Sequence, residues 1–366
     1  MSSWPDIRKA QCADGQNCKA DCASRDDLSE VVISGDLYIV GIVPVHAKGE
    51  TPVLCGSINS GGFDVAESIK FAIQEAKNNF PGDIPSGNIG SIIIDSCNDP
   101  QVIQEKVLSL YRNGVEGDPN VKDKILGFVG AWSSDVSVVL GDILTRLNYT
   151  QISYGSTSPE LSNTAMYPYF LRIPSSDIYQ AETIVKITET IGSQYVQIVY
   201  SDGAYGIGGR DVIRDKAKQL NTCIVNEIAI TESMDKDKLL SSLRQHKDTR
   251  VVIIWPSSFD TDWLLPLLND NFQQTDFVFI ASEGLGTRVG LRQYKNLVGT
   301  ITVALELPPN TKFSDTLKSL IPDGSFSRSW LRDYMESTYN CYYEWSFDKS
   351  SNEQCRYRSI SSRIRS

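Results

Sequence analysis

Buried strands alternate with amphipathic helices twice along this chain, and this alternation restricts the fold more than any other feature of the sequence. In the first set, near-continuous runs of apolar and β-branched residues have the composition of strands buried on both faces. These predicted strands span residues 36–44, 91–95 and 125–130. Stretches with apolar residues at helical spacing follow them, at 63–79, 102–111 and 133–147. This order predicts a parallel, doubly wound sheet with ligands at the carboxyl ends of its strands.

The pattern then begins again after a short predicted strand at 151–154. Predicted helices span 178–191, a stretch ending near 220, and 235–245; predicted strands span 195–200, 223–227, 250–255 and 277–281. Two such sets in 366 residues predict an α/β protein of two lobes, with the cleft between them as the ligand site. We divide the chain into an N-terminal cysteine-containing extension (1–35), lobe 1 (36–172) and lobe 2 (173–309). An incomplete return segment to lobe 1 (310–355) follows, with predicted helices at 313–321 and 329–339, and then a disordered tail (356–366).

The charge of the chain excludes one class of partner. A formal net charge of −10 argues against binding nucleic acid, whose phosphates require a positive surface. No run approaches the roughly 18–20 apolar residues of a membrane span. Residues 1–22 lack an apolar core, so we expect neither a signal peptide nor a transmembrane segment in this chain.

The eight cysteines, at positions 12, 18, 22, 55, 97, 223, 341 and 355, are more than a reducing cytosol usually allows. A zinc site would need short Cys-x2–4-Cys pairs, and Cys18 and Cys22 form the single such spacing. Neither His46 nor His246 lies near it in sequence. We therefore favour disulfides and expect no metal. The triplet Asn148-Tyr-Thr150 is a candidate glycosylation site, as expected of a secreted domain.

Catalytic motifs are absent from the sequence. It contains no Gly-x-Ser-x-Gly, His-Glu-x-x-His or phosphate-binding Gly-Lys-Thr/Ser motif. The run Gly203-Ala-Tyr-Gly-Ile-Gly-Gly209 has the wrong glycine spacing for a dinucleotide site and is better explained as a strand-to-helix turn. We therefore expect no cofactor and no enzyme.

Polar side chains gather where predicted strands give way to helices. Trp132-Ser-Ser-Asp135 begins the helix at 133–147, and Gly155-Ser-Thr-Ser158 follows the neighbouring strand. Hydroxyl and backbone N–H groups there can hold a carboxylate, although Ser133 or Ser134 could simply cap the helix and the second run could be a polar turn. In lobe 2, Asp177, Tyr205 and Glu283 offer the carboxylates and aromatic face that suit an ammonium group. Asp177 could instead be a helix N-cap, and Tyr205 a packed aromatic.

Together these segments resemble the extracellular "Venus flytrap" domain of metabotropic glutamate receptors, class C of the G-protein-coupled receptors. The resemblance spans about residues 36 to 355. It rests on Gly41-Ile-Val-Pro-Val-His46, Val129-Gly-Ala-Trp-Ser-Ser134, Gln151-Ile-Ser-Tyr-Gly-Ser-Thr-Ser158 with Leu161-Ser162, Tyr167-Pro-Tyr-Phe-Leu-Arg172, Ser201-Asp-Gly-Ala-Tyr-Gly206 and Ala281-Ser-Glu-Gly284. It implies a fold of the type I periplasmic-binding-protein kind.

The resemblance also implies a set of ligand residues. Ser134 and Thr157, with backbone N–H groups around Ser156, would hold the α-carboxylate of an amino acid. The α-ammonium would lie among Asp177, Tyr205 and Glu283, although the family usually has aspartate at the last position.

One departure from the family concerns the distal side-chain pocket, to which we assign Asp64 and Trp132. Glutamate-responsive members have arginine at the start of the first helix, whereas residues 55–67 contain no basic residue. An unpaired ligand carboxylate beside Asp64 would cost about 2–5 kcal/mol. We therefore expect an α-amino acid other than glutamate, with a neutral or basic side chain.

The family's disulfides imply the pairs Cys55–Cys97 and Cys341–Cys355. Cys223 matches a cysteine that bonds to a linker domain this chain lacks, so it should be a free thiol, and Cys12, Cys18 and Cys22 have no counterpart. The family also implies a homodimer or heterodimer through lobe 1, at the extracellular face of the plasma membrane in the full-length receptor. G-protein coupling would require a transmembrane domain absent from this chain.

Three alternatives remain open at this level. A type I solute-binding protein would share the fold without a membrane domain. A soluble decoy or splice fragment would bind ligand or partner subunits without signalling. A Rossmann-type enzyme is disfavoured by the missing nucleotide motif. We also expect strands left unpaired at sheet edges, because the chain stops short of the family's last passage through lobe 1.

Overall fold

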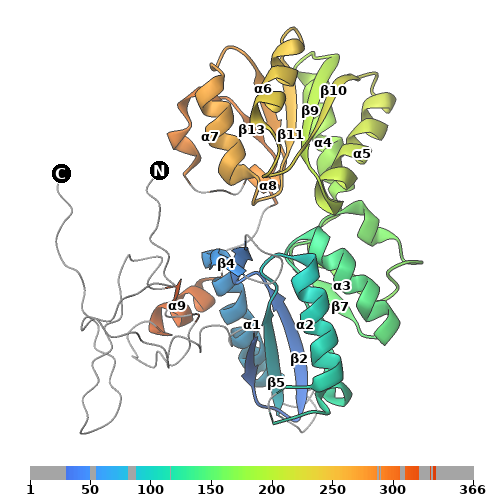
Figure 1. Cartoon of the computed structure of the whole chain (residues 1–366), viewed down its shortest axis with the longest axis vertical. Helices are drawn as coiled ribbons and strands as arrows, with labels where there is room; N and C mark the ends of the chain where they lie inside the picture. Colours follow the sequence, from blue (N-terminus) through green and yellow to red (C-terminus); the bar gives the residue numbers. More distant parts are fainter. Residues whose placement is uncertain are drawn as a thin grey trace, which may run out of the picture.

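The computed structural model describes residues 30–49, 55–80, 88–115, 117–286, 288, 290–305, 310–320, 330, 333 and 334. These residues form two α/β lobes, one above the other in Figure 1, each built on its own largely parallel sheet. The expected two-lobed α/β fold is therefore confirmed. The expected Cys341–Cys355 pair, Cys12, Cys18, Cys22 and the tail at 356–366 lie outside the described residues.

Lobe 1 contains a six-stranded sheet of order β1-β5-β2-β6-β7-β8. Its strands are β1 (Glu30–Ile33), β2 (Leu37–Val43), β5 (Ile89–Asp95), β6 (Ile125–Val129), β7 (Gln151–Ser153) and β8 (Phe170–Arg172). All neighbours are parallel except β1, which pairs antiparallel with β5. The carboxyl ends of the parallel strands consequently lie at one edge, which faces lobe 2.

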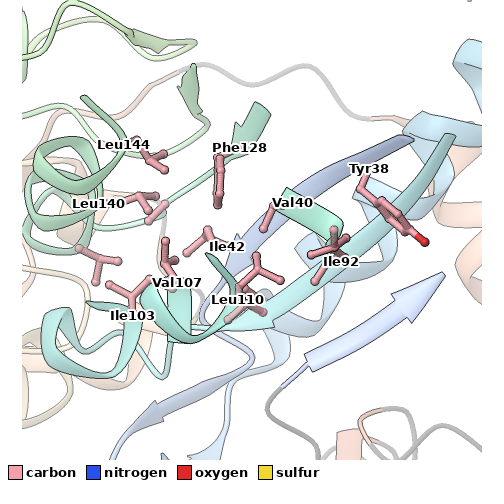
Figure 2. Packing of buried hydrophobic residues seen from close by; sticks show 14 of the residues in the cluster. Tyr38, Val40, Ile42, Ile92, Ile103, Val107, Leu110, Phe128, Leu140 and Leu144 are labelled. Carbon is pink, nitrogen blue, oxygen red and sulfur yellow. The ribbon is translucent and has the colours of Figure 1, made fainter. Parts of the chain in front are cut away.

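Helices cover lobe 1 on both faces of this sheet. They are α1 (Ser60–Asn79), α2 (Pro100–Asn113) and α3 (Ser134–Leu147), with side-chain N-caps at Asn59, Asp99 and Ser133. Alternate residues of β2 and β5 pack against α2 and α3, as Val40 and Ile92 do in Figure 2, where Leu140 belongs to α3. The remaining residues of these strands pack against α1. Both faces of each central strand are thus buried, which explains their near-continuous apolar sequence.

The α1 face of the sheet is only partly covered. Val129 in β6 packs in the α1 cluster, and Ile152 and Leu171 continue the same row across β7 and β8. Ile152 is 37% exposed and Leu171 is 58% exposed. Among the described strands, β8 is the outermost on this side, so an open strand edge lies beside exposed apolar side chains.

Shorter elements complete lobe 1. They are the hairpin β3 (His46–Lys48) and β4 (Cys55–Ile58), and the 3-10 helices η3 (Val121–Lys124) and η4 (Pro159–Ser162). A disulfide joins Cys55 to Cys97, with the two Cα atoms 5.2 Å apart. It ties the strand before α1 to the end of β5.

Lobe 2 contains a five-stranded parallel sheet of order β10-β9-β11-β12-β13. Its strands are β9 (Tyr195–Ser201), β10 (Cys223–Ile230), β11 (Val251–Trp255), β12 (Val278–Ala281) and β13 (Ile301–Thr302). Helices α4 (Asp177–Thr190) and α5 (Ala204–Gln219) pack on one face, and α6 (Lys236–Gln245) and α7 (Thr261–Asn271) on the other. The short helices α8 (Glu283–Gly286), η5 (Leu291–Gln293) and η6 (Lys295–Leu297) lie between β12 and β13.

The chain then returns to lobe 1. Helix α9 (Thr311–Leu320) lies beside α1 in Figure 1, where the rings of Phe313 and Phe71 are 5.6 Å apart and Lys312 pairs with Glu75. Tyr334 stacks on Phe63 of α1 at 4.4 Å.

Several elements differ from the sequence prediction. Strand β1 falls inside the segment that we assigned to the N-terminal extension; at four residues on a sheet edge it is too short for a periodic signal. Helix α7 was not predicted because Pro266 lies inside it and removes one backbone donor. Burial of Leu264, Leu265 and Leu268 in the lobe 2 core stabilises the helix in spite of this proline.

Candidate functional site

Three of the predicted site residues meet where the two lobes approach each other. Thr157 follows β7 of lobe 1, and its hydroxyl donates to Oε1 of Glu283 at 3.4 Å. Asp177 is the first residue of α4, and its backbone N–H donates to the Thr157 carbonyl at 2.9 Å. Glu283 begins α8 directly after β12, at the carboxyl edge of the lobe 2 sheet. The group therefore joins strand ends of both lobes.

Gln180 connects the two carboxylates. Its Oε1 accepts from the Glu283 N–H at 2.6 Å and its Nε2 donates to Asp177 Oδ1 at 3.0 Å. The sequence prediction missed this residue, although its place three residues after Asp177 puts both side chains on one face of α4. Gln180 fixes the carboxylates near each other without neutralising either one.

The Asp177 side chain is not used as the N-cap of α4, because another residue caps this helix. The alternative of an Asp177 N-cap is wrong: the N-cap of α4 is Ser176, whose hydroxyl accepts from the Ile178 N–H. Asp177 is 1% exposed, and its Oδ2 accepts no hydrogen bond from the described residues. The same holds for Oε2 of Glu283.

Burial and mutual repulsion disfavour the charged forms of these carboxyls. Burial, together with the nearby charge of Glu283, raises the pKa of Asp177 well above its usual value. Burial likewise raises the pKa of Glu283. Arg172 acts in the opposite direction on Asp177, but its guanidinium already donates to the Ser158 carbonyl at 2.8 Å. Two buried oxygens without donors create a site that a cation with N–H groups would satisfy.

Tyr205 is both a packed aromatic and a polar neighbour of this group. Helix α5 begins at Ala204, so Tyr205 lies in its first turn, with its ring 5.7 Å from that of Trp255. Its hydroxyl donates to Ser282 Oγ at 2.9 Å, next in sequence to Glu283. Burial raises the pKa of Tyr205 beyond its usual range, so the phenol stays protonated.

The predicted hydroxyl cluster of lobe 1 divides into separate roles. Ser133 caps α3, whereas Ser134 is 2% exposed and its Oγ accepts the Ser158 N–H at 3.1 Å. Ser156 is fully buried: its N–H donates to Ser153 Oγ at 2.9 Å and its hydroxyl to Ser137 Oγ at 2.7 Å. The atoms of Ser156 that we expected to hold a carboxylate are thus already used inside lobe 1.

Among the described residues, the two that we assigned to the distal pocket make their contacts away from the Asp177 and Glu283 carboxylates. Asp64 is in α1; its Oδ1 is buried without a hydrogen bond from the described residues, and burial raises its pKa. Trp132 is 42% exposed and lies against Tyr154, with ring centroids 6.2 Å apart. Among the described residues, no hydrogen bond, ion pair or ring contact joins either one to Asp177 or Glu283.

Asp135 has a role that the sequence did not reveal. Its Oδ1 accepts the N–H of Ala204, the first residue of α5, at 2.5 Å, so a lobe 1 side chain caps a lobe 2 helix. These residues are 69 positions apart, and no local pattern connects them.

The cysteine and glycosylation candidates are placed as follows. Cys55 and Cys97 lie beside Asp95, but their sulfurs form the disulfide instead of a metal site. Cys223 begins β10, is exposed, and forms no disulfide with a described cysteine. Asn148 is an exposed residue at the C-cap of α3, in the left-handed conformation.

This arrangement, two α/β lobes with a polar group between their strand ends, is that of a ligand-binding domain, and comparison with known proteins agrees. Residues 64–361 match the receptor family ligand binding region, and the chain belongs to this family. It is 27% identical over 334 residues to metabotropic glutamate receptor 4 of Macaca fascicularis and 27% identical over 338 residues to metabotropic glutamate receptor 8 of Homo sapiens. The alignments cover 86% and 87% of this chain and 36% and 37% of those receptors, so the chain spans about a third of its relatives' length.

The resemblance to the extracellular domain of metabotropic glutamate receptors is therefore confirmed. The family is one of receptors and not of enzymes. Among the described residues, no helix combines the length and the apolar character needed to cross a membrane.

Proposed function

We propose that this chain is the ligand-binding region of a metabotropic-glutamate-receptor-like receptor and that it binds an α-amino acid between its lobes. The observation that supports this most directly is the pair of buried oxygens without donors, Asp177 Oδ2 and Glu283 Oε2. An α-ammonium group carries three N–H donors and one positive charge, so it satisfies both oxygens and removes their repulsion. The Thr157 hydroxyl and the Tyr205 ring complete the surroundings of this ammonium.

The ligand carboxylate would then lie toward lobe 1, on Ser134 and Thr157, with the Thr157 hydroxyl turning its hydrogen from Glu283 Oε1 to the ligand once the ammonium satisfies Glu283. Both follow strands whose carboxyl ends face lobe 2, and the Ser134 hydroxyl retains its own hydrogen for donation, since its oxygen acts as acceptor for Ser158. Ser156 contributes through packing and not through direct contact, because its polar atoms are occupied.

Selectivity against glutamate follows from Asp64. A buried carboxylate oxygen without a donor repels a second carboxylate and attracts a neutral or basic group. We assign Asp64 to the distal side-chain pocket on this basis, add Trp132 because its ring is partly exposed two residues before Ser134, and expect ligands with neutral or basic side chains.

A thermal-shift screen of the twenty amino acids on the chain tests the site. We expect neutral or basic amino acids to raise the melting temperature and glutamate to leave it unchanged. Ser134→Ala combined with Thr157→Ala should abolish every shift, whereas Ser241→Ala, at an exposed serine of α6, should change nothing. A full response in the double variant would refute the carboxylate anchor, and a strong response to glutamate would refute the selectivity.

We propose that lobe 1 ends at residue 172 and that lobe 2 extends from 173 to 309. In a full-length receptor, lobe 1 would also mediate dimerisation, and a transmembrane domain outside this chain would couple to a G protein. The domain would then lie at the extracellular face of the plasma membrane, with Asn148 available for glycosylation. The exposure of Asn148 at the end of α3 and the Cys55–Cys97 disulfide support this extracellular location. Digestion of receptor from mammalian cells with a glycosidase, compared with Asn148→Gln, tests it: an identical gel mobility before and after digestion would contradict it.

A further inference from the structure

The glycine-rich start of α5 lies against lobe 1, and its glycines fit this contact. A Cβ atom at Gly203 would lie 2.4 Å from Asp135 Oδ1, and one at Gly208 would lie 2.9 Å from Pro159 Cδ. A Cβ atom at Gly206 would lie 1.9 Å from the Ser201 carbonyl oxygen, and one at Gly209 would lie 2.3 Å from Trp255 Cε2, both inside lobe 2. The segment whose spacing failed as a nucleotide motif is therefore a packing surface, two of whose glycines face the other lobe.

Three hydrogen bonds form a closed circuit at this surface. The Ala204 N–H donates to Asp135 Oδ1 at 2.5 Å, and the Ala204 carbonyl accepts from Ser158 Oγ at 2.9 Å. The Ser158 N–H in turn donates to Ser134 Oγ at 3.1 Å, and Ser134 is next to Asp135 in the chain. One residue of lobe 2 is thus held through both its backbone polar groups by lobe 1.

The Asp135 contact is electrostatically favourable for a second reason. The N-terminus of α5 carries free N–H groups and the positive end of the helix dipole, and α5 has no acidic residue in its first turn and no side-chain N-cap of its own. Asp135 supplies the missing cap from the other lobe. Burial raises the pKa of Asp135, and the hydrogen bond from the Ala204 N–H acts in the opposite direction by stabilising the carboxylate.

We propose that Asp135, Ser158, Gly203 and Ala204 form an interlobe clasp that holds the two lobes in contact without any bound ligand. In this arrangement the chain itself supplies contacts between the two lobes that a bound ligand would otherwise make. The clasp shifts the resting equilibrium between separated and contacting lobes toward contact, and it does so whether or not the ligand is an amino acid. The inference thus goes beyond the proposed ligand and does not depend on it.

Hydrogen–deuterium exchange of the ligand-free chain tests the clasp directly. The amide of Ala204 should be protected in the wild type, and Asp135→Ala should speed its exchange about 10- to 100-fold, as expected for loss of a hydrogen bond to a charged group. Asp135→Asn, which keeps an acceptor oxygen but removes the charge, should give an intermediate rate. Asp142→Ala, at an exposed acid on the same helix, serves as the matched control.

The second arm approaches the clasp from lobe 2. Gly203→Ala should speed the same exchange, and the double variant with Asp135→Ala should be no faster than either single one, because both break one contact. Small-angle X-ray scattering of ligand-free protein should show a larger radius of gyration in each variant. Circular dichroism and protection of the β9 and β11 amides show whether a variant is unfolded. If Asp135→Ala or Gly203→Ala is unfolded, the exchange rate and radius of gyration of Asp135→Asn test the clasp instead. An unprotected Ala204 amide in the wild type, or an unchanged rate and radius in folded Asp135 variants, would overturn the clasp. Failure of the amino-acid screen alone would leave it standing.

Discussion

Replacing Glu283 by glutamine should stabilise the ligand-free protein while weakening ligand binding. Glu283 and Asp177 each have a buried oxygen without a donor, and burial raises the pKa of both. Glu283→Gln removes one of the two charges and introduces an amide N–H₂ that can donate to Asp177. A buried acceptor without a partner costs about 1–3 kcal/mol, so the variant should gain a similar amount at neutral pH.

The sign of the pH dependence follows from the raised pKa values. A carboxyl whose folded pKa lies above its unfolded value of 4.5 retains its proton in the native state after the unfolded chain has lost it. Its contribution to stability is fully present below the unfolded value and is lost as pH rises through the folded value. The wild type should therefore lose stability as the pH rises above the unfolded value, and Glu283→Gln should lose less; the two proteins are compared at about pH 5 and about pH 8.

Thermal unfolding followed by circular dichroism at both pH values gives the measurement. At about 2–4 °C per kcal/mol, we expect Glu283→Gln to melt about 2–12 °C above wild type at the higher pH and the difference to shrink at the lower one. Glu189→Gln, at an exposed position of α4, controls for the loss of one charge. In the amino-acid screen, Glu283→Gln should weaken any responding ligand by about 1.5–3 kcal/mol. A variant that melts with the wild type at both pH values would refute the reasoning.

Three further outcomes test the packing and the thiols. Leu140→Ala, fully buried between α3 and the lobe 1 sheet, should lower the free energy of unfolding in urea by about 2–5 kcal/mol; a loss under 1 kcal/mol would mean that the core collapses around the gap. Gly209→Ala would place a Cβ 2.3 Å from Trp255 Cε2 and should cost about 1–3 kcal/mol in the same assay, a prediction that an unchanged unfolding midpoint would contradict. Cys223→Ser should reduce by one the thiols that react with Ellman's reagent in the native protein, with a free energy of unfolding within about 0.5 kcal/mol of wild type; an equal thiol count would show that Cys223 is not free.

The regular elements could be predicted because their signals are local. Strands such as β2 and β11 are continuous apolar runs, and α2 and α3 show helical periodicity between recognisable caps. Strand β1 and helix α7 could not be found in this way. An edge strand of four residues has no measurable period, and a proline in a helix is tolerated only where tertiary packing compensates for it.

The residue types of the site could be predicted from the sequence, but the directions in which their side chains point could not. The resemblance indicated Asp177, Tyr205 and Glu283, and the structure brings these residues to one place. The inward direction of Ser156 depends on partners in β7 and α3, and the cap that Asp135 provides depends on how one lobe rests on the other. Both are long-range properties that no window of sequence contains.

The open edge at β8 has a practical consequence for any experiment on this domain. Exposed Ile152 and Leu171 lie beside backbone groups that no described strand covers, which is the arrangement that invites strands of separate molecules to add to one another. Turbidity in concentrated samples would then arise from pairing at β8, and it would be mistaken for ligand-induced association if protein concentration were not held constant. A charged residue in place of Leu171 offers a way to keep the domain monodisperse while leaving both carboxylates and the clasp untouched.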